Sequence, residues 1–363
     1  MVSHGMPPNF LMLVIAFMLG TVVGVIWNLK GIQFGLIDLQ RCNIRSKILF
    51  SQKSDWTGRL SFLSTSKFNH ELQNNLILGA AVGLHLSVLH RFVQSARASC
   101  NLCTITLLVH DFSMRSDDFR LLSDVFHVVL IPYQQFLLSN KHETFVMTAI
   151  YSQRWTIFSS YLQTLQNEGK AFDNVFICDV SDTVFQANVF KHMNTMGDGL
   201  YVFLEDIHFR ISEQKINANW VKICYGQQML QQIGDKSISC SGTVLGSWPA
   251  IITYLSAMAA QFLTRSRACL RIAGNDQGVH NFIIYNGLIP DTKIYLIPHE
   301  TGFVGTLALP KWLKRNKFGY ILNSRSEIYA VVHQINRSPQ LLAQFDRVYQ
   351  TLPDDALNRK AYY

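Results

Sequence analysis

The chain has 363 residues, 48% of them hydrophobic, and a formal net charge of +8 at pH 7. A chain of this size buries a sizeable core, and seven cysteines are too few for a fold held together by disulfides. Lysines and arginines are scattered without a run of five or six like charges, so the charge favours an anionic ligand such as a nucleotide, or a membrane surface, over a nucleic-acid stripe.

Residues 10–29 read FLMLVIAFMLGTVVGVIWNL and contain no charged side chain. That length spans a hydrocarbon core of about 30 Å. A cleaved signal peptide, the alternative, usually has an apolar core of about 7 to 15 residues behind a basic start. Residues 1–9 contain no Lys or Arg. We therefore predict a short tail followed by an uncleaved transmembrane anchor.

The segment 30–74 mixes Ser, Lys, Gln and Asn and predicts a stem. It also holds the basic residues that follow the anchor, Lys30, Arg41, Arg45 and Lys47. By the positive-inside rule these residues would place the large domain in the cytosol. We assign 75–345 to that domain and 346–363 to a carboxyl-terminal tail.

The large domain opens with alternating strand and helix patterns. Apolar strands are expected at LILGAAVG from Leu76, at 104–109 and at 125–131, with helices at 84–96 and 148–166. This alternation predicts a parallel, doubly wound sheet.

Small residues end the first predicted strand. Gly79 and Ala80, with Gly83 after them, would let a nucleotide base lie close to the backbone. The alternative is that they are packing residues at a strand-to-helix turn.

Two carboxylates follow the apolar strand at 175–178. Asp179 and Asp182 stand at its carboxyl end, where an open parallel sheet forms its ligand crevice. Hard oxygen ligands there suit Mg²⁺ or Mn²⁺ carrying a diphosphate. The alternative is that Asp179 caps a turn and Asp182 is surface decoration.

Four later segments carry further polar residues at the ends of apolar runs. They are YVFLEDIHF (201–209) with Glu205 and Asp206, the turn-rich SCSGTVLGSW (239–248), GNDQGVHNFIIYNG (274–287) with Asp276 and Gln277, and VVHQINRSP (331–339) with His333. Taken singly, they are equally well explained as solvated strand ends, a helix N-cap at Asn275 or Asp276, and a structural histidine.

Read together with DVSDTVFQ (179–186), these segments resemble the nucleotide-sugar glycosyltransferases of the GT-A type, which carry a DxD-like metal motif at the end of a central strand. The similarity covers 74–342, with the motifs in the order typical of such a domain. DVSD departs from a strict DxD, because Val180 stands where the first aspartate usually falls. The departure leaves open which carboxylates bind the metal.

The resemblance implies a GT-A (Rossmann-like) mixed, mainly parallel sheet with helices on both faces. It implies metal-dependent transfer of a sugar from a nucleotide-diphosphate donor to a hydroxyl of a glycan, glycoprotein or glycolipid. It also implies a single-pass type II protein with a lumenal domain in the Golgi, against the charge rule. The alternative is a non-catalytic, membrane-anchored sugar-binding protein that retains the fold.

The resemblance also implies roles for individual residues. Mn²⁺ or Mg²⁺ would be held by Asp179, Asp182 and His333, since carboxylates and neutral imidazole are competent ligands. Donor contacts would come from Gly79, Ala80, Arg154, Asp179, Ser241 and Gly242, with the Arg154 guanidinium on the diphosphate; a surface salt bridge is the alternative for Arg154. Catalytic roles would fall to Asp276, Gln277, Glu205 and Asp206, a carboxylate being able to accept a proton from the acceptor hydroxyl.

The cysteines give weaker expectations. Cys224 and Cys240 lie between two of the family-like motifs and are expected to form a disulfide. Cys100 and Cys103 form a CxxC, which without a second pair is weak evidence for zinc. Cys178 lies inside the central strand and is expected to be a small buried hydrophobic residue.

Overall fold

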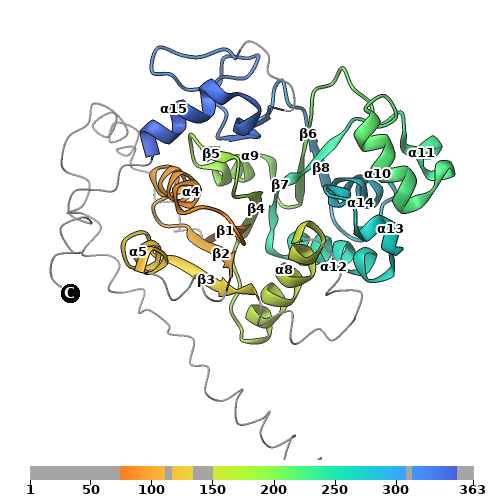
Figure 1. The fold of residues 1–363 in the computed structure, drawn as a ribbon, viewed down its shortest axis with the longest axis horizontal. Helices are drawn as coiled ribbons and strands as arrows, with labels where there is room; N and C mark the ends of the chain where they lie inside the picture. The colour runs from red at the N-terminus through yellow and green to blue at the C-terminus, as the bar shows by residue number, and fades with distance from the viewer. Residues whose placement is uncertain (1–73, 111–116, 134–149, 308–312, 350–363) are drawn as a thin grey trace, which may run out of the picture. The chain divides into compact units, whose positions relative to one another are not determined.

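The computed structural model describes residues 74–110, 117–133, 150–307 and 313–349 (Figure 1). The expected tail, the anchor at 10–29 and all but the last residue of the stem lie outside these described residues. Within the described ranges, no helix is long and apolar enough to cross a membrane.

A seven-stranded sheet forms the centre of the described part of the chain. Across the sheet the strands are β3 (Val128–Pro132), β2 (Thr104–Val109), β1 (Asn75–Ala80), β4 (Asn174–Asp179), β7 (Ser239–Ser247), β6 (Leu200–Leu204) and β8 (Ile294–Ile297). Neighbouring strands are parallel except at β7, which runs antiparallel to both β4 and β6. The sheet is therefore mixed and mainly parallel, as the resemblance implied, and the wholly parallel sheet expected from the βαβ pattern is corrected at β7.

A second, three-stranded sheet brings a late segment next to an early one. Its order is β5 (Thr183–Phe185), β10 (Val331–His333) and β9 (Val304–Thr306). β10 runs antiparallel to β5, so that His333 pairs with Thr183, the residue that follows Asp182. This register carries the last predicted motif to the acidic segment.

Helices cover both faces of the large sheet. α4 (Leu86–Ser99) and α5 (Asp117–Phe126) pack on one face, whereas α8 (Ile150–Asn167), α12 (Trp248–Thr264) and α14 (Asn275–Tyr285) pack on the other. Alternation along β1 explains the division, because Ile77 joins the first core while Leu76 and Leu78 join the second.

Smaller elements pack outside the large sheet. α10 (Lys215–Tyr225) and α11 (Gln227–Ile233) share an apolar cluster of their own with Ile211 and Ile238. α15 (Pro339–Tyr349) lies beside α4 (Figure 1) and packs on the small sheet through Leu341 and Phe345. The remaining short helices are η3 (Val189–His192), α9 (Met193–Met196), α13 (Arg267–Leu270) and η4 (Ile335–Arg337).

Two expected elements are corrected. The strand expected at 125–131 begins only at Val128, since Val125 and Phe126 end helix α5. The turn-rich segment at 239–248 is instead strand β7, whose nine residues are all buried. Its small residues have a packing reason: a Cβ on Gly246 would lie 3.0 Å from the Gly199 carbonyl oxygen. The domain end at 345 stays a prediction; that residue lies within α15.

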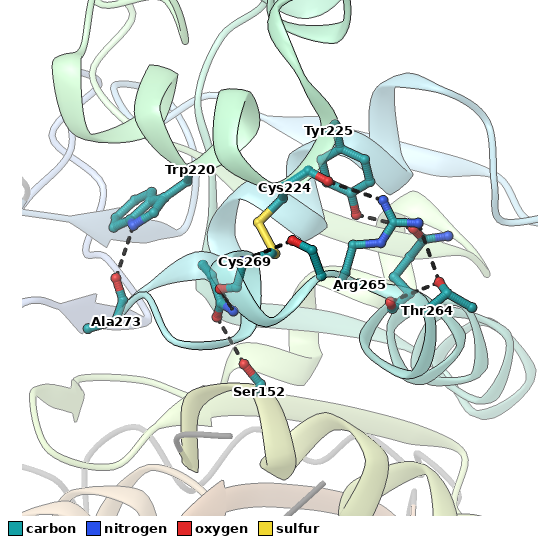
Figure 2. The surroundings of a disulfide bond; sticks show 11 residues. Ser152, Trp220, Cys224, Tyr225, Thr264, Arg265, Cys269 and Ala273 are labelled. Atoms are coloured by element: carbon teal, nitrogen blue, oxygen red, sulfur yellow. Dashed lines mark hydrogen bonds between the residues drawn. A yellow bond between two sulfur atoms is a disulfide. The ribbon is translucent and has the colours of Figure 1, made fainter. Parts of the chain in front are cut away.

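The expected Cys224–Cys240 disulfide is wrong. Cys224, on α10, pairs with Cys269 on α13 (Figure 2), whereas Cys240 is a free, buried thiol in β7. The interior strand keeps Cys240 away from α10, and only the folded position of α13 brings Cys269 within reach of Cys224. Cys100 and Cys103 form a disulfide with each other, and Cys178 is free and buried as expected.

Candidate functional site

The strand order of the large sheet reverses between β1 and β4. The chain runs outward from β1 through β2 to β3, and then returns to place β4 on the other side of β1. In open α/β sheets, ligands bind outside the carboxyl ends of the strands at such a switch point. Ala80 and Asp179, the last residues of the two strands, pair in register there.

Asp179, Asp182 and His333 meet at this point. One ligand-type atom from each lies within 4.8 Å of the others. His333 Nε2 is 3.5 Å from Asp179 Oδ2 and 3.6 Å from Asp182 Oδ1. The imidazole is 1% exposed, and its Nε2 has no hydrogen-bond partner within the described part of the chain. A buried nitrogen this close to two carboxylates is stabilised by a positive charge, which either a proton on the imidazole or a bound cation supplies.

Gly242 of β7 borders two of these side chains, Asp179 and His333. A Cβ at this position would lie 2.4 Å from His333 Cε1 and 2.6 Å from Asp179 Oδ2. Only glycine therefore lets the strand approach the cluster, and the space it leaves adjoins the ligand-type atoms. Two carboxylates and one imidazole form a donor set that suits Mn²⁺ or Mg²⁺, so the residues present fit the expected metal.

Burial and neighbouring charges set the pKa values of His333 and Asp179. Burial by itself favours the neutral imidazole, but Cys240 and the two carboxylates outweigh it and raise the pKa of His333 well above its usual value. Burial likewise favours a protonated Asp179, yet Arg154 and His333 hold the pKa of Asp179 below its usual value. Asp179 is therefore ionised at neutral pH, as a metal ligand must be, whereas His333 must release its proton to bind a metal.

The acidic loop is held from two directions. Arg91, a buried residue of α4, donates from Nη2 to the Ser181 carbonyl oxygen at 2.6 Å and forms an ion pair with Asp346 of α15. The backbone amide of Ile335 donates to the Asp182 carbonyl oxygen at 3.1 Å. Helix α15 and the segment after His333 thereby fix the backbone that carries both aspartates.

A second group of side chains centres on Arg154 of α8. Its Nη1 forms an ion pair with Asp179, and its Nη2 donates to Asp276 Oδ2 at 2.6 Å. Trp155 Nε1 and Ser241 Oγ approach the same oxygen, at 3.3 Å and 3.4 Å. Burial raises the pKa of Asp276, while Arg154 and Trp155 favour its ionised form.

Arg154 thus links the expected metal cluster to the start of α14. It is buried, so the alternative of a surface salt bridge does not apply. Each terminal nitrogen binds a carboxylate, and contact with a donor diphosphate stays a proposal.

Gln277, the next residue on α14, joins three elements. Its Nε2 donates to Glu205 Oε1 at the end of β6, at 3.0 Å, and to Asn217 Oδ1 of α10, at 2.8 Å. Burial raises the pKa of Glu205, and Gln277 and His333 oppose that shift. Asp206 is only half-buried, and its Oδ1 accepts a hydrogen bond from the His208 backbone amide in a turn.

The structure therefore brings most of the expected residues together. Those that meet around the end of β4 are Arg154, Asp179, Asp182, Ser241, Gly242, Asp276 and His333, with Glu205 and Gln277 joined to each other beside them. Gly79 differs, because a Cβ there would lie 2.4 Å from Val180 Cγ2, which gives this glycine a packing reason. Ala80 is half-buried beside Asp179.

Sequence reasoning missed several contributors to the site. Trp155 directly follows Arg154, and Cys240 precedes Ser241, so both are sequence neighbours of predicted site residues. Trp155 Nε1 donates to Asp276, and Cys240 Sγ lies 3.6 Å from His333 Nδ1. Arg91 and Asn217 lie in unremarkable helical sequence, and no local signal pointed to them.

No protein-family model matches the chain, and no curated protein matches it in sequence. Among solved structures, it is similar to the galactosyltransferase LgtC in complex with donor and acceptor sugar analogues, with 11% identity over 78% of this chain and 99% of that chain and a TM-score of 0.43. An active-site mutant of LgtC gives 12% identity over 77% and 98% of the two chains and a TM-score of 0.41. At these values the similarity carries no argument about activity, which must rest on the site itself.

Proposed function

We propose that this chain is a metal-dependent glycosyltransferase that moves a sugar from a nucleotide-diphosphate donor to a hydroxyl of a glycan, glycoprotein or glycolipid. The observation that supports it most is the meeting of Asp179, Asp182 and His333 at the β1–β4 switch point. An anionic diphosphate needs such a cation site beside it in an otherwise acidic crevice.

In this proposal Asp179, Asp182 and His333 hold Mn²⁺ or Mg²⁺, which when bound stabilises the negative charge on the leaving diphosphate. Arg154 keeps Asp179 ionised and oriented, because its guanidinium is fixed at its other end by Asp276. Ala80, Ser241 and Gly242, with Gly79 behind them, border the donor.

Gln277 and Glu205 are the proposed acceptor side of the site, with Asp276 beside them. Both Gln277 amide hydrogens are directed at Glu205 and Asn217, so its Oε1 is the atom left to accept from a sugar hydroxyl. The acceptor oxygen bonds to the anomeric carbon as the bond to the diphosphate breaks, the electron pair leaves with the diphosphate, and the hydroxyl proton passes to Glu205. A raised pKa suits that carboxylate to act as a base near neutral pH. Asp206 stays a candidate for holding the acceptor at the rim.

The proposal extends to the location of the protein. The uncharged segment 10–29 would anchor it in the Golgi membrane as a type II protein with a lumenal domain. Two disulfides in the described residues support an oxidising compartment, against the count of basic residues after the anchor. Protease treatment of sealed microsomes tests this part: digestion of the large domain without detergent would mean that it faces the cytosol.

The activity is tested by incubating the purified chain with a panel of nucleotide sugars, with and without Mn²⁺, and measuring released nucleotide. We expect release from at least one donor, lost on chelation and restored by Mn²⁺. The Asp182→Asn variant serves as the matched inactive control. The non-catalytic alternative predicts sugar binding that chelator does not affect, with no nucleotide released from any donor, and that result would end the proposal.

A further inference from the structure

The first turn of α14, which carries Asp276 and Gln277, is fixed by the residue before them. Asn275 is 0% exposed. Its Oδ1 accepts a hydrogen bond from Ser152 Oγ of α8 at 3.0 Å, and its Nδ2 donates to the Cys269 carbonyl oxygen at 2.8 Å. One side chain thus ties the start of α14 both to α8 and to α13.

The α13 end of this tie is itself anchored. Cys269 is joined by the disulfide to Cys224 of α10, in the arrangement that Figure 2 shows. Arg265 strengthens the join, because its Nη1 donates to the Cys224 carbonyl oxygen at 3.2 Å and its guanidinium lies 4.6 Å from the Tyr225 ring centre. The carbonyl that accepts from Asn275 is therefore held in place by α10.

Trp220 of α10 closes the remaining side. Its Nε1 donates to the Ala273 carbonyl oxygen at 2.9 Å (Figure 2). Its ring lies so close to Gly274 that a Cβ there would meet Cζ2 at 2.4 Å, and Gly274 has a φ of 78° that glycine adopts without strain. These contacts restrict the backbone conformation of the residues just before α14.

Ser152 and Arg154 both project from α8, and they meet consecutive residues of α14. Ser152 binds Asn275, and Arg154 binds Asp276. A shift of Asn275 would carry Asp276 away from Arg154, because the two residues are adjacent in one helical turn. Arg154 in turn holds Asp179, so the shift would reach the acidic cluster.

We propose that Asn275 is a positioning residue: by joining α8 to the disulfide-anchored turn, it sets the geometry at which Arg154 meets Asp276. Asparagine is suited to this task because its amide offers one acceptor and one donor at a fixed spacing. A carboxylate at this position would face the Cys269 carbonyl without a proton to donate. The consequence for turnover rests on the proposed function, whereas the positioning itself does not.

The indole N–H of Trp155 reports on this geometry directly, since it donates to Asp276 Oδ2. The experiment records indole ¹H–¹⁵N signals of the full chain labelled at tryptophan, with Trp155→Phe to assign the signal. Asn275→Ala and Ser152→Ala should each move the Trp155 signal. Asn286→Ala is the matched control, because Asn286 is a half-buried asparagine that caps the far end of the same helix and bonds to Phe282 and to α11, and it should leave that signal in place.

Ser152→Ala removes a single hydroxyl and covers the case in which Asn275→Ala does not fold. An unmoved Trp155 signal in the folded Ser152→Ala or Asn275→Ala chain would overturn the proposal. So would a shift of the same size in Asn286→Ala, which would indicate a general loss of stability.

Kinetics give the second readout. Asn275→Ala should lower kcat for nucleotide release by about tenfold to a hundredfold, the range typical of supporting residues around a site, with donor KM changed by less than about threefold. The double variant with Ser152→Ala should be no slower than Asn275→Ala alone, since Asn275→Ala already removes the hydrogen bond that Ser152→Ala removes. Additive losses would contradict the shared path. If the unmodified chain releases no nucleotide from any donor, the proposed function fails, while the Trp155 signal still decides the positioning role.

Discussion

Replacing Gly242 by alanine should weaken metal binding while leaving the protein folded. The added methyl would lie 2.4 Å from His333 Cε1, 2.6 Å from Asp179 Oδ2 and 2.7 Å from His333 Nε2. Carbon atoms in contact prefer about 3.5 Å, so the imidazole or the strand must retreat by about 1 Å.

Neither side chain has free room to retreat. His333 has Cys240 Sγ behind it, 3.6 Å from Nδ1, and Asp179 is tied to Arg154. Overpacking of this kind costs about 1–3 kcal/mol, which lowers the melting temperature of a domain of this size by several degrees. A ligand set displaced by about 1 Å should lose Mn²⁺ affinity by at least about tenfold to a hundredfold and turnover by about a hundredfold.

Gly246→Ala provides the matched control on the same strand. Its Cβ would lie 3.0 Å from the Gly199 carbonyl oxygen and 3.1 Å from Ile251 Cγ1, away from the acidic cluster. We expect Gly246→Ala to lose stability but keep Mn²⁺ affinity, measured by isothermal titration calorimetry alongside thermal unfolding. A folded Gly242→Ala protein that binds Mn²⁺ as tightly as the unmodified chain would refute the assignment of this site.

Three further predictions test separate parts of the molecule. Asp182→Asn should lose metal-dependent turnover with a melting temperature within a few degrees of the unmodified chain, because among the described residues its carboxylate has only Ser181 Oγ and the His333 imidazole as polar partners; full activity would remove Asp182 from the site. Arg91→Met should cost about 1–3 kcal/mol in urea unfolding and raise the Mn²⁺ concentration for half-maximal turnover, because it frees the Ser181 carbonyl and leaves Asp346 unpaired; an unchanged metal titration would confine Arg91 to stability. Burial lowers the pKa of His280 to about 3, so the unfolded chain takes up a proton below about pH 6.5 that the folded chain refuses, and stability is lost as the pH falls towards 3. The free-energy advantage of the unmodified chain over His280→Gln should therefore shrink by about 1.4 kcal/mol per pH unit between pH 6 and 4, and parallel pH–stability curves would contradict it.

Local sequence patterns predicted the elements that are marked by a short apolar run with polar residues at its ends. The apolar runs of β1, β2, β4 and β6 are short and bounded by polar residues, and each forms a strand close to where it was expected. The position of Asp179 at the carboxyl end of β4 followed from that pattern, because a strand end is a local property. The helix that carries Arg154 was expected for the same reason.

Long-range pairing was not predictable from the same patterns. SCSGTVLGS is rich in Gly and Ser, which are common in turns, yet it forms a fully buried strand because β4 and β6 flank it on both sides. The cysteine pairing was wrong for a related reason: Cys224 and Cys269 come together only once α10 and α13 have packed. The burial of Arg154 between Asp179 and Asp276 likewise depends on where α14 lies over α8.

The predicted metal cluster depends both on local sequence patterns and on long-range strand pairing. Each ligand-type residue was visible in the sequence as a polar residue at the end of an apolar run. Their meeting, however, depends on β10 pairing antiparallel to β5, which sets His333 opposite Thr183 and so beside Asp182. The amide of Ile335 then binds the Asp182 carbonyl, and Arg91 binds the Ser181 carbonyl while pairing with Asp346. The carboxyl-terminal segment therefore does more than supply one imidazole, because its strand and helix also hold the loop on which both aspartates stand.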